Sequence, residues 1–189
     1  MQKTDISFKR IQQLAIPAII SGIAEPVLFR TDVAIVGNLA EFGTESLAAV
    51  GIVGAFLSML IWVLGQTRSA ISSIVSQNLG AGNLEKLKNF PAQAIFFNIG
   101  LSIIVLASTW LFIDEIFKLL NAEGVILQLS LDYYYIRVWG FPLTLFTFAI
   151  FGLFRGLQNT FWPMVIAAIG TAVNIVLDIT LVYGVDNYI

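Results

Sequence analysis

The sequence predicts an all-α, polytopic membrane helix bundle of about five transmembrane helices. The 189 residues are 58% hydrophobic and only 12% charged, and the mean hydropathy is +0.86. A soluble domain of this size could not bury so much apolar surface. Five apolar runs, separated by polar segments, are each long enough for an α-helix to cross a hydrocarbon core of about 30 Å. These observations together predict an integral membrane protein.

The five spans are predicted at residues 14–37, 47–67, 92–113, 133–154 and 161–184. Their orientation follows from the cations, because cytoplasmic loops carry an excess of Lys and Arg. Seven cations fall on one side of the predicted bundle, namely Lys3, Lys9, Arg10, Arg68, Lys86, Lys88 and Arg155. The opposite loops hold only Lys118. We therefore expect a multi-pass protein of the plasma (inner) membrane with its N-terminus in the cytoplasm.

The composition excludes several classes of function. The chain has no Cys and no His, which removes disulfides, thiolate or imidazole metal sites, and nucleophiles that need either side chain. The net charge is -2 and there is no basic tract, which argues against a nucleic-acid partner. We expect no enzyme activity and no cofactor, and the lipid bilayer as the surrounding medium.

The first span contains three ionisable residues, Glu25, Arg30 and Asp32. An ionised side chain at membrane depth costs at least ~2.5 kcal/mol, so such residues normally face a protein interior or a wet cavity. Glu25 and Asp32 are two helical turns apart and share a face, whereas Arg30 points elsewhere. The alternative is that the three residues only pair with one another or belong to an interfacial helix, which the apolar flanking residues disfavour.

Two prolines, Pro17 and Pro26, lie in the same span. Each removes a backbone donor and tends to kink a helix. We therefore expect a bent first span, with these prolines as hinges.

The polar connections also carry predictions. Residues 69–79 continue the second span as a weakly amphipathic helix, which Gly80 and Gly82 should end. Residues 114–132 are expected to form a short interfacial helix and a loop. Residues 155–163 are expected to be a short turn, with Asn159 or Thr160 capping the fifth helix and Pro163 in its first turn.

The fifth span contains a second polar pair, Asn174 and Asp178, one turn apart and on one face. Asp32 lies 18 residues past Leu14 and Asp178 lies 17 past Phe161, roughly 26 Å along each helix. Because both spans run in the same direction, the two carboxylates are predicted to be level.

Oxygens from Asp32, Asn174 and Asp178, with Glu25 near mid-membrane, would suit Na⁺. If the two acids approach closely, their repulsion would instead make one of them hold a proton. Either arrangement is a cation site for coupled transport. The alternative is that Asn174 and Asp178 only form hydrogen bonds between packed helices.

Several motifs in order extend this interpretation. Pro17 is followed by Asp32 within TDVAIVG, QNLGAGN follows the second span, FRGLQNTFWPM forms the turn before the fifth, and TAVNIVLDITLVYG carries Asn174 and Asp178. From about residue 8 to its end, the chain resembles the amino-terminal half of a multidrug and toxic compound extrusion (MATE) transporter. It is most similar to the DNA-damage-inducible branch.

The resemblance implies an antiporter in which H⁺ or Na⁺ entry drives the export of organic cations, including drugs. It implies that the acid late in the first helix, Asp32, forms the cation site with Asn174 and Asp178. A tyrosine of the fourth helix joins this site in some relatives. Among Tyr133, Tyr134 and Tyr135 we expect Tyr135, because it directly precedes the Ile-Arg pair.

The chain also departs from the family, whose members have twelve helices in two six-helix lobes. A complete carrier would need the carboxy-terminal lobe, or a second chain that supplies it. One alternative is a lipid-linked oligosaccharide flippase of the same superfamily. Such proteins usually need cations lining the lumen, and the predicted spans hold only Arg30 and Arg137. The other alternative is a truncated, non-transporting membrane module that docks onto another subunit.

Overall fold

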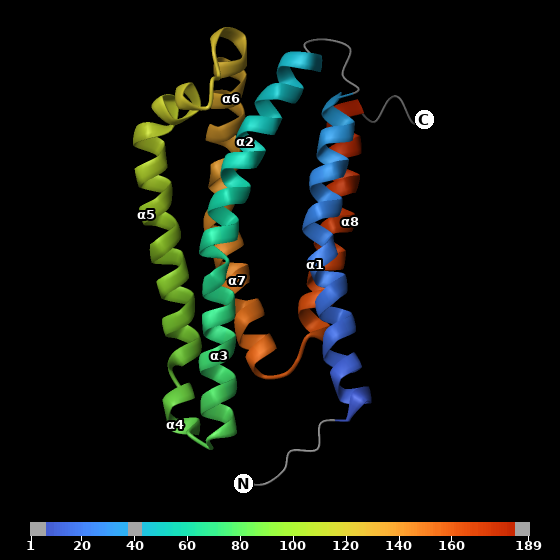
Figure 1. Ribbon diagram of the computed structural model, residues 1–189, viewed down its shortest axis with the longest axis vertical. Coiled ribbons are helices and arrows are strands. Elements are labelled where there is room, and N and C mark those ends of the chain that lie inside the picture. The colour runs from blue at the N-terminus through green and yellow to red at the C-terminus, as the bar shows by residue number, and fades with distance from the viewer. Residues whose placement is uncertain (1–6, 38–42, 184–189) are drawn as a thin grey trace.

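The computed structural model describes residues 7–37 and 43–183 (Figure 1). Within these ranges six side chains are not described, those of Glu25, Phe29, Asp32, Val36, Val182 and Tyr183. The described part is helical and contains no strand. It has five candidate spans that are long and apolar enough to cross a membrane. The predicted fold class is therefore confirmed.

The first two spans are longer than predicted. α1 (Phe8–Gly37) remains a single helix through Pro17 and Pro26. α2 (Gly43–Leu64) and α3 (Gln66–Gly80) are separated only by Gly65 and form one candidate span of 38 residues. α3 confirms the predicted continuation of the second span. It ends at Gly80, and Gly82 has a φ of 72°, a left-handed conformation that glycine adopts without strain.

The connections before and after the third span are tighter than predicted. A single helical turn, α4 (Leu84–Leu87), leads into α5 (Phe90–Leu119). The interfacial helix predicted within residues 114–132 is wrong, because α5 continues to Leu119 and α6 (Gly124–Arg137) begins five residues later. Asn121 reverses the chain with a φ of 61°, and Lys118 pairs with Asp114 one turn before the end of α5.

The fourth span is not a single helix. α6 passes into a 3-10 turn, η1 (Val138–Gly140), and then into α7 (Phe141–Gly156). Pro142 stands in the first turn of α7, where its missing N–H costs little. The chain then turns at Gln158, whose φ is 58°, and enters α8 (Phe161–Tyr183), with Pro163 in the first turn as predicted.

The helices form two groups (Figure 1). The five longer helices between α1 and α8, which are α2, α3, α5, α6 and α7, pack against one another. Their largest buried cluster is aromatic: Phe56 meets Phe117 edge-on at 5.9 Å between ring centroids, and both contact Tyr134. The Tyr134 hydroxyl donates to Thr109 Oγ1 at 2.6 Å, so its polar end is satisfied. We call this group the α2–α7 body.

Two glycines bring α7 against α3 within this body. A Cβ built on Gly152 would lie 2.7 Å from the carbonyl oxygen of Arg68, and one built on Gly156 would lie 2.5 Å from Val75 Cβ. Neither distance leaves room for a methyl group. Small residues four apart allow two helices to approach this closely in a membrane.

α1 and α8 form the second group and lie side by side along most of their length (Figure 1). The prediction that the first and fifth spans are neighbours is therefore confirmed. At the base of the pair, Thr160 Oγ1 donates to the Leu14 carbonyl oxygen at 3.0 Å, and Arg10 Nη2 donates to Gln158 Oε1 at 2.8 Å. These two bonds connect the start of α1 to the turn before α8.

Candidate functional site

One face of α8 carries three buried oxygen atoms that have no hydrogen-bond partner among the described residues. They are Thr171 Oγ1, Asn174 Oδ1 and Asp178 Oδ2. The spacing of three and four residues puts them on one side of the helix. A buried polar atom without a partner costs about 1–3 kcal/mol, and more if it is charged. A bound ion or water molecule is one way to satisfy a row of this kind.

α1 is the helix that packs against α8, and the Thr160–Leu14 hydrogen bond sets the register between the two. Leu28 and Asn174 each lie 14 residues beyond this bond, and they line the same cavity. Asp32 and Asp178 each lie 18 residues beyond it, about 27 Å along parallel helices. Their backbones are therefore level.

The side chains of Asp32 and Glu25 are among those that the structure does not describe. Their backbone positions belong to α1, and Asp32 follows Leu28 by one helical turn. The predicted convergence of the Asp32 and Asp178 carboxylates therefore stays a prediction.

A cavity of about 420 Å³ separates the α1/α8 pair from α7 and α3. Ser21 and Leu28 line it from α1, and Thr171 and Asn174 from α8. Arg68 of α3 reaches it from the opposite side. We call this space the ion cavity. Two of the three unpartnered α8 oxygens belong to residues that line it.

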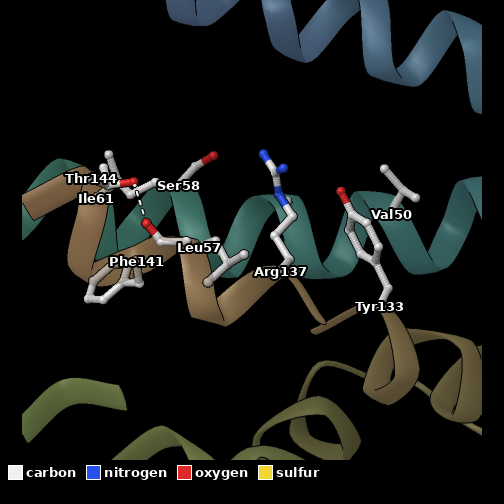
Figure 2. Close-up of a pocket in the computed structure, with 10 residues that line it drawn as sticks. Val50, Leu57, Ser58, Ile61, Tyr133, Arg137, Phe141 and Thr144 are labelled. Carbon is white, nitrogen blue, oxygen red and sulfur yellow. Dashed lines mark hydrogen bonds between the residues drawn. The ribbon is translucent and has the colours of Figure 1, made fainter. Parts of the chain in front are cut away.

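A second cavity, of about 540 Å³, adjoins the first and shares Leu28, Arg68, Thr144 and Phe148 with it. We call it the arginine cavity, because Arg137 as well as Arg68 lines it. A smaller pocket of about 160 Å³ extends it along α2. In Figure 2 the Arg137 guanidinium and the Ser58 hydroxyl point to the same side, towards α1.

Arg68 corrects the sequence analysis, which counted it among the cytoplasmic loop cations. Because α3 continues α2 beyond Gly65, Arg68 lies within a long helix and not in a loop. It lines a cavity together with Leu28, a residue of the middle part of α1. Its guanidinium carbon is 5.0 Å from the centre of the Phe148 ring, and its buried Nε has no hydrogen-bond partner in the part of the chain that the structure describes.

Arg155 lies deeper than a loop position as well. It stands in the last turn of α7, and its Nη2 donates to Ser21 Oγ of α1 at 3.4 Å. The statement that only Arg30 and Arg137 lie in the spans is therefore wrong, because the lengths of α3 and α7 were underestimated.

The three adjacent tyrosines of α6 point in different directions. Tyr133 lines the pocket beside Arg137, whose guanidinium carbon is 6.0 Å from the Tyr133 ring centre (Figure 2). Tyr134 is fully buried in the aromatic cluster. Tyr135, the expected site residue, packs against Trp110 of α5 at 4.7 Å between ring centroids. The structure thus brings Tyr133 to the cavities, because successive residues of a helix are rotated by about 100°.

The remaining predicted residues lie on α1. Pro26 and Arg30 are exposed, and Pro17 is partly buried. The helix is unbroken at both prolines. The hinge roles of Pro17 and Pro26 remain predictions.

Comparisons with known proteins agree with this architecture. The family model MatE matches residues 17–180. The chain is 28% identical to the DNA damage-inducible protein F of Escherichia coli K12 over 94% of its own length and 38% of that protein. It is 26% identical to the multidrug resistance protein MdtK of Edwardsiella ictaluri, covering 97% of this chain and 40% of that one.

A solved structure, the outward-facing conformation of a multidrug resistance MATE family transporter of the MOP superfamily, has a TM-score of 0.84 and 25% identity. That match covers 93% of this chain and 38% of the solved one. The chain thus spans about two fifths of the length of the relatives it matches. It belongs to the MatE family and corresponds to the amino-terminal half of a MATE transporter.

Proposed function

We propose that this chain forms the amino-terminal lobe of a cation-coupled antiporter that exports small organic compounds. The observation that carries the proposal is the row of buried, unpartnered oxygens on α8, Thr171 Oγ1, Asn174 Oδ1 and Asp178 Oδ2. Its position against α1, with the backbones of Asp32 and Asp178 level, supplies the second wall of an ion site. Multidrug transport in the relatives named above supports the export role.

In this proposal Asp32 is the principal ion-binding carboxylate, Asn174 and Asp178 are its partners, and Glu25 is secondary. Thr171 joins them, which the sequence analysis did not foresee. A proton or Na⁺ would give the unpartnered oxygens a bond, so the loaded and empty lobes differ in stability. A difference of several kcal/mol is enough to reverse the populations of two conformations. The Pro26 hinge would allow α1 to follow that change.

Alternating access requires a second lobe, supplied by a continuation of this chain or by another chain. The proposed location is the inner membrane with the N-terminus in the cytoplasm. Without Arg68 and Arg155, five of the seven inner cations of the sequence analysis remain, against Lys118 on the other side. The bias that predicts the orientation therefore persists.

Labelling of single cysteines in intact cells tests the orientation. Cysteines at Thr44 and Lys118 should react with an impermeant reagent from outside, and a cysteine at Lys86 only after the cells are opened. Reaction of the Lys86 cysteine in intact cells would contradict this topology.

Direct ion binding tests the coupling site without any assumption about the cargo. The purified two-lobed transporter should bind radiolabelled Na⁺, or take up protons on acidification of an unbuffered sample. Asp32→Asn and Asp178→Asn should each abolish this binding, whereas Asp114→Asn, which changes an acid at the far end of α5, should not. Unchanged ion binding in both Asp32→Asn and Asp178→Asn would refute the proposal.

The flippase alternative gains one observation from the structure. Arg68 joins Arg137 in the arginine cavity, so cations line the interior of this lobe more fully than the sequence suggested. Transport of a lipid-linked oligosaccharide in reconstituted vesicles, with no effect of Asp32→Asn, would favour that alternative. A two-lobed protein that transports neither class of compound would favour the non-transporting module.

A further inference from the structure

We propose that the arginine cavity binds the anionic group of aromatic organic anions, and that such anions are the cargo of this lobe. The inference rests on the proposed function as an exporter and names its substrate class. The resemblance predicted organic cations instead. The charged side chains that the structure describes along this cavity, Arg68 and Arg137, favour the opposite sign.

The first argument is the charge of the cavity wall. Arg68 and Arg137 both line the 540 Å³ space, and neither has an ion pair with any residue of the described part. The only ion pair there joins Lys118 and Asp114, at the far end of α5. Arg68 is partly buried and Arg137 is exposed, and a cation without a counter-ion is costly at membrane depth wherever water does not reach it. An anionic ligand would supply the missing charge, whereas an organic cation would be repelled.

The second argument is the geometry of the two guanidinium groups. Each lies near one aromatic ring, Arg68 at 5.0 Å from Phe148 and Arg137 at 6.0 Å from Tyr133. Contact with an aromatic ring fixes the orientation of the guanidinium plane. The N–H groups at the edge of the guanidinium stay available, and they can bind two oxygens of a carboxylate, sulfonate or phosphate group. The buried Nε of Arg68, which has no partner, is one such donor.

The third argument is the remainder of the lining, which suits an aromatic body. Trp62 and Phe148 contribute aromatic side chains, and Ser58, Gln66 and Thr144 contribute polar groups. A volume of 540 Å³ falls in the range of pockets that hold small organic molecules, about 300–1,000 Å³. The cavity can therefore hold a compound of two fused rings with one acidic substituent.

The cargo site and the ion site draw on different helices. Arg68 comes from α3 and Arg137 from the last turn of α6, whereas the acids assigned to ion binding belong to α1 and α8. The two sites can therefore be tested separately, although their cavities adjoin.

The experiment is a calorimetric titration of the two-lobed transporter in phosphatidylcholine nanodiscs. The probes are 1-naphthalenesulfonate and the matched cation trimethyl-1-naphthylammonium. We expect the sulfonate to bind at least about tenfold more tightly, and Arg68→Gln and Arg137→Gln each to weaken it about tenfold, as expected for loss of a hydrogen bond to a charged group. Arg68→Lys should restore part of the affinity.

Two control variants separate this proposal from other effects. Arg10→Gln removes an exposed arginine that bonds Gln158 outside the cavity, and it should leave sulfonate binding unchanged. Asp178→Asn should bind the sulfonate normally while it loses ion binding. A result that refutes the ion site would therefore not refute the cargo site, and a result that refutes the cargo site would not refute the ion site.

Three outcomes would overturn the inference. Tighter binding of the ammonium probe would assign the cavity to organic cations. Unchanged sulfonate binding in both Arg68→Gln and Arg137→Gln would place the anion elsewhere. The third outcome is that phosphatidylglycerol, when it is added to the nanodiscs, displaces the sulfonate, and that neither arginine variant binds this lipid. The cavity would then be a site for a lipid headgroup instead of a cargo.

Discussion

The α1/α8 pair and the α2–α7 body are both built from apolar sequences, but they are packed in different ways. In the most apolar window of α1, and of α8, no residue is buried, whereas between 17% and 39% of the corresponding windows in the other three spans is buried. The body encloses an aromatic cluster in which the Tyr134 hydroxyl is hydrogen-bonded, and its buried Arg68 Nε and Ser130 Oγ have no partner among the described residues. In the pair, the buried oxygens without a partner among the described residues form a row on one face of α8.

This difference separates a rigid wall from an adjustable one. The body is stabilised by packed aromatic rings and by two glycine contacts that leave no room for a side chain between α7 and α3, so these helices are not expected to shift. The α1/α8 pair meets the body mainly across two cavities and through the contacts of α1 with α2. Ligand binding should therefore move the pair as a unit against the body.

The largest expected effect is on the pair. In the complete transporter, Asp32→Asn should abolish driven export from vesicles while the protein remains folded and membrane-inserted, because the variant side chain has no proton to lose and no negative charge to balance a bound cation. Arg30→Gln should cost much less, because Arg30 is exposed on another face of α1. Export should be measured with a fluorescent organic cation and with a fluorescent aromatic anion. Normal export of either compound by Asp32→Asn would remove Asp32 from the coupling site.

The next effect should appear in the body, as lost stability. Gly156→Ala places a methyl group where Val75 Cβ is 2.5 Å away, so α7 must move from α3 or Val75 must be displaced. Overpacking of this kind typically costs about 1–3 kcal/mol. Gly100→Ala is the matched control, since a Cβ there meets nothing within 4 Å. The melting temperature in detergent should fall for Gly156→Ala only. Equal melting temperatures for the two variants would show that the close approach of α7 to α3 is unimportant for stability.

The smallest expected effect is at the base of the pair. Thr160→Val removes the hydrogen bond to the Leu14 carbonyl and should cost about 0.5–1.5 kcal/mol. The substitution should also broaden the distribution of distances between spin labels on α1 and α8. Thr180→Val is the control, because the Thr180 hydroxyl bonds only carbonyls of its own helix. A distance distribution that is the same in both variants would show that this bond does not set the register.

The spans were predictable because membrane-spanning segments must be long and apolar wherever they pack. The continuation of the second span and its end at Gly80 followed from local glycine chemistry. The pairing of the first and fifth spans was predicted from two acids at equal depth that each needed partners, and their helices are neighbours. Each of these predictions uses only the sequence of one segment, or a count of residues along two segments.

Other features could not be predicted, because they depend on which residues of different helices meet. The chain contains Gly152 and Gly156 four residues apart, yet only the contact with α3 shows that no Cβ fits there. The choice of Tyr133 over Tyr135 depends on the rotation of α6, which its packing on α5 and α2 decides.

By itself, the sequence determined that this chain is a membrane helix bundle, and it predicted acids at one level in the first and fifth spans, because hydropathy and helical rise are properties of single segments. Only the tertiary structure decided that α3 carries Arg68 into the bundle, where it lines one cavity with Arg137. The physical reason is that the charge of a cavity is a sum over helices distant in sequence, and no single segment contains that sum.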